Sequence, residues 1–440
     1  MHHTSSSATR WWVAVELIEA ILEEGIRRCD EVEVFGTNGT SLSLTLKGGI
    51  LHSAELSRSW GVGIRTIEKG KIGFSSTSDP GRWRECLKAA CESGTAATHQ
   101  EWKGLPGPVE YPLRAPTHDP SLFPNLDPAQ LLADALLEGA GEHPVTITGG
   151  SVDLSRGTII LANSRGVRYT APRTLASISL EAIHGTSTGY EFDASVFMEL
   201  DARAVGEQAA FLASHCDGGY DISTGDYDLV LSPIAVAQLL GHAVVPALSG
   251  RNVHAGRSRL SGELGKQCLD EGLSLYDDPF ARGTGATDWD GEGVLARRIP
   301  FVNDGVLERF AYDLKTASRY GTESTASAVR SGYGGAPAIG VHNLVVDGER
   351  TGVFDDKALF VHDIVGAHTA NPLTGDFSVE LSNAYWIEGG IPGTPVRKAM
   401  YAGNIFEAFR SIGGLGKESR VVGSAILPPV RLNKQRIIGK

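Results

Sequence analysis

The sequence predicts an α+β fold in two domains, an N-terminal α+β domain over 1–218 and a C-terminal, mainly β domain over 219–440. A chain of 440 residues is long enough for two domains that each bury a core. In the first half, helical periodicity gives way twice to strand-like alternation. The second half consists of short alternating segments between Gly, Asn and Asp turns, which is typical of a barrel or a sandwich.

The first half begins with an amphipathic segment, in which Val15, Ile18, Leu22 and Ile26 recur at helical spacing between glutamates. Strict alternation follows, as in half-buried strands. The predicted elements are a helix over 11–28, strands over 31–35 and 41–46 with a turn at 37–39, a hairpin over 60–74 and a helix over 81–94.

A proline-rich, polar stretch over 102–126 predicts an extended connection. Beyond it the helix and strand patterns return, and the Asp217–Gly219 turn is the predicted domain boundary. The elements expected here are a helix over 128–140, strands over 145–154, 158–163, 167–170 and 175–181, and a helix over 202–214.

The second half opens with a strand over 227–231 and the uncharged run Leu229–Gly250. That run is long enough to span a bilayer, but it contains Pro233, Gln238 and His242, so we expect a buried helix and no membrane span. After residue 270 we expect short strands, and no further helix before 403–412.

The charge and the cysteine content of the chain restrict its expected partners and cellular compartment. The chain has 40 basic and 52 acidic residues and a net charge of −12, which argues against nucleic acid as a partner. Its five cysteines form no C-x-x-C pair, which favours a reducing compartment. The polar N-terminus is unlike a secretory signal, so we expect a cytoplasmic protein.

Several short motifs carry little chemistry on their own. Gly185–Gly189 matches the nucleophile elbow G-x-S-x-G, but strands flank it on both sides, which predicts a hairpin turn instead. Gly413–Lys417 has the wrong spacing for a phosphate loop. The thirteen histidines form no H-E-x-x-H, and the carboxylates of Asp288–Glu292 fit turn caps better than a calcium site or an acid and base pair.

The chain resembles the TldD/TldE (PmbA) family of metalloproteases over nearly its whole length. The motifs that carry the resemblance occur in the family's order: 61–65, 70–76, 163–166, 239–240, 276–279, 290–293, 324–330, 343–344 and 374–378. The resemblance implies an α+β N-terminal domain, a β-rich C-terminal domain and a dimer enclosing a cavity in which peptides are cut. We expect glycines of these motifs at tight turns: Gly61, Gly63, Gly166, Gly293 and Gly375.

The family's catalytic member, TldD, carries H-E-x-x-x-H after a Leu-Leu pair and a cysteine near its C-terminus, which together hold zinc. Aligning Leu239-Leu240 with that pair places Gly241 at the first histidine, His242 at the glutamate and Pro246 at the second histidine. Leu415 takes the place of the cysteine. The pattern is similar to that of TldE/PmbA members, which lack the metal motif and pair with a TldD-like subunit.

Three hypotheses follow. In the first, the chain is a non-catalytic subunit that binds no zinc or other cofactor, and a TldD-like partner supplies the zinc that cleaves peptides. In the second, it is a hydrolase of a specialised substrate whose centre has moved to some of five residues: His242, His254, His368, Asp290 and Glu292. In the third, it is a homodimeric binding protein without a protease partner.

Overall fold

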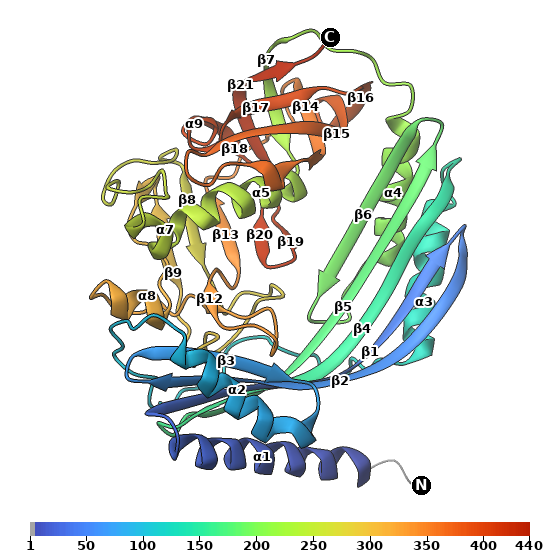
Figure 1. Cartoon of the computed structure of the whole chain (residues 1–440). Coiled ribbons are helices and arrows are strands. Elements are labelled where there is room, and N and C mark those ends of the chain that lie inside the picture. Colours follow the sequence, from blue (N-terminus) through green and yellow to red (C-terminus); the bar gives the residue numbers. More distant parts are fainter. Residues whose placement is uncertain (1–4) are drawn as a thin grey trace.

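The computed structural model describes residues 5–440, and a long antiparallel sheet of six strands forms its first half (Figure 1). The strand order is β3-β2-β1-β4-β5-β6, so the sheet consists of two three-stranded meanders that meet at β1 and β4, with β3 and β6 outermost. The strands are β1 (Glu31–Lys47), β2 (Ile50–Glu68), β3 (Lys71–Thr77), β4 (Thr146–Asn163), β5 (Arg168–His184) and β6 (Ser187–Ser195).

Two pairs of helices pack on this sheet at different ends (Figure 1). Alternate residues of β1 face them: Val32 and Val34 enter the core under one pair, and Leu42 and Leu44 the core under the other. The first pair is α1 (Ser5–Ile26) and α2 (Trp83–Thr95), and the short helix η1 (Pro80–Arg82) leads directly into α2. The second pair is α3 (Leu126–Ala140) and α4 (Ala202–His215).

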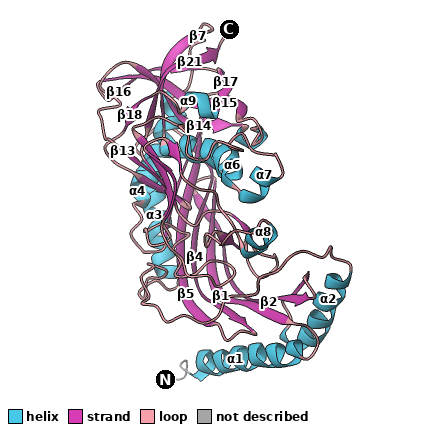
Figure 2. Ribbon diagram, turned by 90° about the vertical axis from the view of Figure 1, so that its left-hand side faces the viewer, coloured by secondary structure: helices cyan, strands magenta, loops and turns pink. Residues whose placement is uncertain are grey.

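The second half contains two larger sheets that share the main hydrophobic core with a helical segment between them. The sheet that contains β7 and β21 lies at the opposite end of the molecule from α1 and α2 (Figure 2). One sheet has the order β10-β9-β8-β13-β20-β19, and the other joins β14, β7, β21, β17, β15, β16 and β18. Their strands are β7 (Gly225–Leu231), β8 (Leu273–Asp277), β9 (Ile299–Asn303), β10 (Val306–Leu307), β13 (Leu344–Gly348), β14 (Ala358–Val365), β15 (Asp376–Glu388), β16 (Ile391–Val396), β17 (Met400–Asn404), β18 (Ile412–Leu415), β19 (Arg420–Val422), β20 (Ala425–Leu427) and β21 (Val430–Ile438). The small hairpin β11 (Ala328–Val329) and β12 (Ala338–Ile339) completes the strands.

The predicted α+β class with a mainly β second half is confirmed. The predicted turn at 37–39 is wrong, because β1 runs through it without a break. Asn38 pairs with Trp60 on one side and Thr158 on the other, so the ladder holds this turn-like sequence extended. The chain reverses instead at Gly48 and Gly49, whose φ angles are +61° and +77°. Likewise, the predicted strands over 145–154 and 158–163 are one strand, β4.

The sequence predicts no helix between residues 270 and 403, but the structure has the α-helix α8 (Leu314–Arg319) there. This helix is too short to show a periodicity, and its signal is local: the Asp313 side chain accepts a hydrogen bond from the Thr316 backbone N–H. The predicted helix near 403–412 is only α9 (Ile405–Ala408). Among the residues described, no helix is long and apolar enough to cross a membrane.

Two of the five motif glycines do not lie at turns. Gly166, Gly293 and Gly375 have positive φ angles, as expected. Gly61 and Gly63 lie inside β2, which corrects the prediction for them. A β-carbon at Gly61 would overlap the ring of Tyr333, and one at Gly63 its carbonyl oxygen. These glycines therefore let the second half of the chain lie directly on the first sheet.

Replacing Gly63 with alanine should lower the free energy of unfolding by about 1–3 kcal/mol, because the methyl group meets backbone rather than a movable side-chain tip. Urea denaturation followed by circular dichroism measures the change. Gly107→Ala is the matched control, since no atom lies within 4 Å of its β-carbon position. Equal stability of the two variants would show that the close approach at Gly63 does not matter.

Candidate functional site

The segment where the family motif is expected is a broken helix that follows β7. Its parts are α5 (Pro233–Leu239), the π-helical turn η2 (Leu240–Val244), α6 (Val245–Leu248) and α7 (Gly250–His254). The Ser232 hydroxyl caps the start by accepting hydrogen bonds from the backbone N–H groups of Ile234 and Ala235. Apolar side chains then anchor the segment in the main core, which confirms the predicted buried helix.

The π turn changes which side chains share a face. The Val245 N–H donates to the Leu240 carbonyl, five residues back. In an α-helix, at 3.6 residues per turn, residues five apart point about 140° away from each other. The extra residue of a π turn brings positions 241 and 246 to nearly the same side. Pro246, which has no N–H to donate to residue 242, fits such a turn.

Gly241 and His242 are exposed on this turn, and no atom lies within 4 Å of a β-carbon built on Gly241. His368 lies on the neighbouring short helix η3 (Ala367–Thr369) and is also exposed. It does not share a strand face with His362, because β14 ends at Val365. His254 is engaged elsewhere: its ring stacks on Tyr320 at 3.9 Å, and its Nε2 lies 3.1 Å from the Tyr312 hydroxyl.

Glu292 belongs to a buried ion-pair network between the two halves, and Asp290 lies two residues before it as a buried acceptor of backbone hydrogen bonds. Arg65 on β2 donates to Glu33 on β1 at 2.7 Å and to Glu292 at 2.5 Å. These three side chains are 3%, 1% and 0% exposed. Arg330 pairs with the other oxygen of Glu33. Asp290 accepts a hydrogen bond from the Glu292 N–H, which makes it a turn cap as the turn interpretation predicts.

The electrostatics of this network follow from its burial. Burial raises the pKa of the Glu292 carboxyl, and the charge of Arg65 opposes part of that rise. The Leu314 N–H also donates to Glu292, at 2.6 Å. Because both carboxylates of the network are closed off from solvent and satisfied, Glu292 and Glu33 hold the halves together and are not placed to meet a substrate.

A second buried cluster was not foreseen from the sequence. Glu191 on β6 pairs with Arg420 on β19 at 2.7 Å and lies 3.3 Å from Nε2 of His362 on β14. Next to His362 along β14, Asp363 accepts a hydrogen bond from Gln238 of α5 at 2.8 Å. Burial lowers the pKa of His362 despite the nearby Glu191. No sequence pattern signals this cluster, since Glu191 and Arg420 are 229 positions apart.

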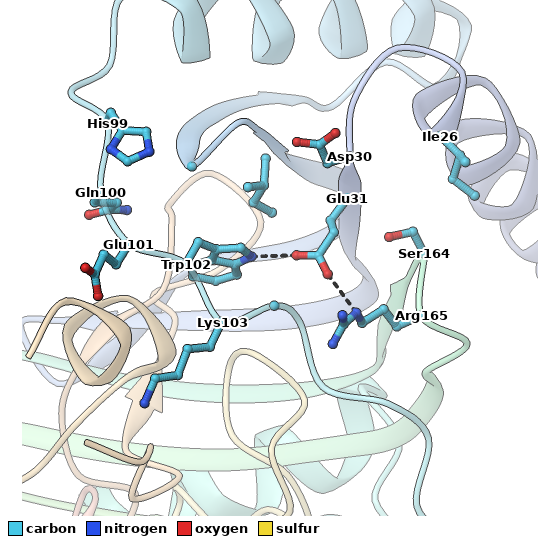
Figure 3. Close-up of a pocket in the computed structure, with 13 residues that line it drawn as sticks. Ile26, Asp30, Glu31, His99, Gln100, Glu101, Trp102, Lys103, Ser164 and Arg165 are labelled. Atoms are coloured by element: carbon cyan, nitrogen blue, oxygen red, sulfur yellow. Dashed lines mark hydrogen bonds and ion pairs between the residues drawn. The ribbon is translucent and has the colours of Figure 1, made fainter. Parts of the chain in front are cut away.

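The first half has an open pocket of about 800 Å³, lined by the end of α1, the start of β1, the loop 99–104 and the turn at 164–165. Figure 3 shows Glu31 between Trp102 and Arg165. The Trp102 indole N–H donates to Glu31 at 2.5 Å, and Arg165 pairs with it at 2.7 Å. The carboxylate is thus satisfied by the pocket's own walls, and no pattern in the sequence predicted this pocket.

Comparison with known proteins decides the family. The models for the PmbA/TldA metallopeptidase domain 1, central domain and C-terminal domain match residues 32–94, 121–216 and 224–439. An uncharacterised protein of Methanocaldococcus jannaschii is 30% identical over 402 residues, which cover 89% of this chain and 93% of that protein. The chain belongs to the PmbA/TldD family.

Other relatives extend along nearly the whole chain. Metalloprotease PmbA of Escherichia coli O157:H7 is 24% identical over 450 residues and covers 96% of both chains. The crystal structure of TldE from Thermococcus kodakarensis has the same fold, with a TM-score of 0.88 at 24% identity, over 96% of this chain and 100% of that one. The family resemblance predicted from the motifs is therefore confirmed.

A metallopeptidase family implies a metal ion, but the residues at the corresponding positions do not fit zinc. Gly241 and Pro246 offer no donor atom, and Leu415 is a fully buried core residue on β18 opposite Val430. Across the described part of the chain, no three His, Cys, Asp or Glu side chains come together as a metal site. His242 and His368 on adjacent turns lack a third ligand of these types.

Arg65→Met should lower the free energy of unfolding by about 3–5 kcal/mol, because Glu292 is left charged and buried without its cation. Adding Glu292→Gln should restore part of the loss, since it removes that charge. Chemical denaturation measures all three variants. Arg27→Met is the control: its partner Glu24 is an exposed neighbour, so its loss should stay below about 1 kcal/mol. If the Arg65 variant loses no more free energy of unfolding than the Arg27 variant, Arg65 does not hold the two halves together.

Proposed function

We propose that this chain is the TldE/PmbA-like, non-catalytic subunit of a TldD/TldE-type metalloprotease complex that cleaves peptides. The observation that carries the proposal is the π turn at Leu240–Val244. It aligns the two positions at which the family motif has histidines, yet glycine and proline occupy them. The turn therefore supports a subunit without its own zinc ligands, and under the proposal zinc and the nucleophilic water belong to a TldD-like partner.

The exposure of the turn supports assembly with a partner. Gly241 and His242 lie at the surface, with open space beside the glycine. A second subunit can therefore reach this surface without repacking the core. Relatives along nearly the whole chain carry the name metalloprotease, which supports a role in proteolysis.

The hypothesis of a relocated centre has less support. Glu292 is buried in the ion-pair network, Asp290 is buried beside it as a turn cap, and His254 contacts two tyrosines. That leaves His242 and His368, which are exposed on the adjacent helical turns η2 and η3. Two imidazoles without a carboxylate or thiolate ligand make a poor hydrolytic centre. The third hypothesis is a homodimeric binding protein. It would be favoured if adding a TldD-like partner conferred no activity.

The chain alone should leave a mixture of unstructured peptides intact, whereas an equimolar mixture with a TldD-like subunit carrying H-E-x-x-x-H should cleave them. Mass spectrometry of the peptides measures both. The control is a partner whose motif glutamate is changed to glutamine, which should abolish cleavage because the bound water loses its base. Cleavage by this chain alone would refute the proposal, as would a mixture that cleaves no faster than the partner alone.

His242→Ala should leave the activity of that complex within about twofold, because a residue outside the reaction makes no transition-state contact. Loss of a general acid or base costs a factor of about 10²–10⁴. Peptide cleavage rates at saturating partner concentration measure the difference. A loss of a hundredfold, with the complex still assembled, would assign His242 to catalysis and favour the relocated centre.

A further inference from the structure

Two of the five cysteines are in direct contact. The Sγ atoms of Cys29 and Cys91 are 3.2 Å apart, although the residues are 62 positions apart in the sequence. All five cysteines lie in the described part of the chain, all are free thiols, and this is the one sulfur–sulfur contact among them. No metal-binding group of three ligands forms there, so the contact is not part of a metal site among the described residues.

The elements that carry the sulfurs are fixed relative to one another. Cys29 belongs to the turn between α1 and β1 and is buried in the core under α1 and α2, against which Cys91 packs. The helix α2 is held in register on β3, because Ser93 accepts a hydrogen bond from the Phe74 N–H. Gly94 of α2 also lies directly over Gly73 of β3, so that a β-carbon at Gly73 would overlap the backbone of α2. A disulfide, with its S–S distance near 2.05 Å, requires only a small approach of the two side chains.

We propose that Cys29 and Cys91 are a redox-modification site, at which a hydroperoxide such as hydrogen peroxide closes a reversible disulfide. The proposal is independent of the protease assignment. Cytoplasmic disulfides of this kind are transient and regulatory rather than structural. The bond would tie the turn after α1 to α2 around a loop containing β1, β2 and β3.

The two thiols have different roles in the reaction. Burial raises the pKa of the Cys29 thiol, whereas Cys91 is partly exposed and meets the oxidant first. The Cys91 sulfur attacks one peroxide oxygen, the O–O bond breaks, and a sulfenic acid and one water form. The Cys29 sulfur then attacks the Cys91 sulfur. The S–S bond forms, the S–O bond breaks, and the hydroxyl leaves with the Cys29 proton as a second water. The two sulfurs supply the two electrons that reduce the peroxide.

Bond formation would also fix one wall of the pocket in Figure 3. Ile26, Asp30 and Glu31 flank Cys29 in the sequence and line that pocket. The Asp30 carboxylate accepts a hydrogen bond from the Lys69 N–H at 2.6 Å, so the turn after α1 is already tied to the β2–β3 turn. A covalent link from the same turn to α2 would tie this wall of the pocket to the helix beside it.

The test treats the folded, reduced chain with hydrogen peroxide and counts free thiols with a chromogenic disulfide reagent after denaturation. We expect the count to fall from five to three and to return to five with dithiothreitol. Trypsin places the cysteines on separate peptides, Cys29 on 29–47, Cys86 on 85–88 and Cys91 on 89–103, so mass spectrometry identifies the linked pair. The oxidised chain should melt several degrees higher, because the link restricts the unfolded chain.

Three variants separate the pair from general oxidation. Cys91→Ser should keep all four remaining thiols under the same treatment, whereas Cys29→Ala should lose only the Cys91 thiol, as a sulfenic acid, and form no linked peptide. Cys86→Ser, which removes another buried cysteine of α2, should still lose two. The proposal is overturned if the count stays at five, if the linked peptides include Cys86, Cys216 or Cys268, or if Cys91 is oxidised beyond the sulfenic acid without joining Cys29. It is also overturned if the link persists in dithiothreitol.

Discussion

The two halves of the molecule depend on one buried cation. Arg65, near the end of β2 in the first sheet, is 3% exposed and pairs with Glu33 of the same sheet and Glu292 of the second half. Charges this deep are tolerated only with complete pairing, so the network fixes how the halves meet. The surrounding contacts follow from that meeting: Tyr333 lies on Gly61 and Gly63, and its neighbour Arg330 reaches Glu33. The network explains two motifs of the family, 61–65 and 290–293, as structural rather than catalytic.

Sequence reasoning found what depends on local patterns. Amphipathic spacing located α1, α2, α3 and α4, and the flanking strands correctly made Gly185–Gly189 a hairpin turn between β5 and β6. It failed where long-range pairing overrides local preference. Thr37–Gly39 has the composition of a turn, yet strands on both sides hold it extended. The partners of Glu191 and Cys29 lie 229 and 62 positions away, so no local signal could reveal them.

The π turn has the clearest functional meaning. A spacing of five residues between ligands is awkward on an α-helix and natural on a π turn, and this chain has a π turn with Gly241 and Pro246 at that spacing. Pro246 also favours the π turn directly. It has no N–H, so it cannot donate the α-helical hydrogen bond to the carbonyl of residue 242. In the function that we propose, backbone geometry and metal chemistry are separable, because the chain has the π turn without residues that can bind zinc.

The central claim is that zinc belongs to the partner, and native mass spectrometry of a co-expressed complex tests it most directly. We expect a complex containing this chain and a TldD-like chain, with one zinc for each TldD-like subunit. After dissociation in the gas phase, the zinc should remain with the TldD-like chain, and this chain should have the mass of its sequence alone. A zinc ion retained by this chain, or a failure of the two chains to associate, would contradict the account.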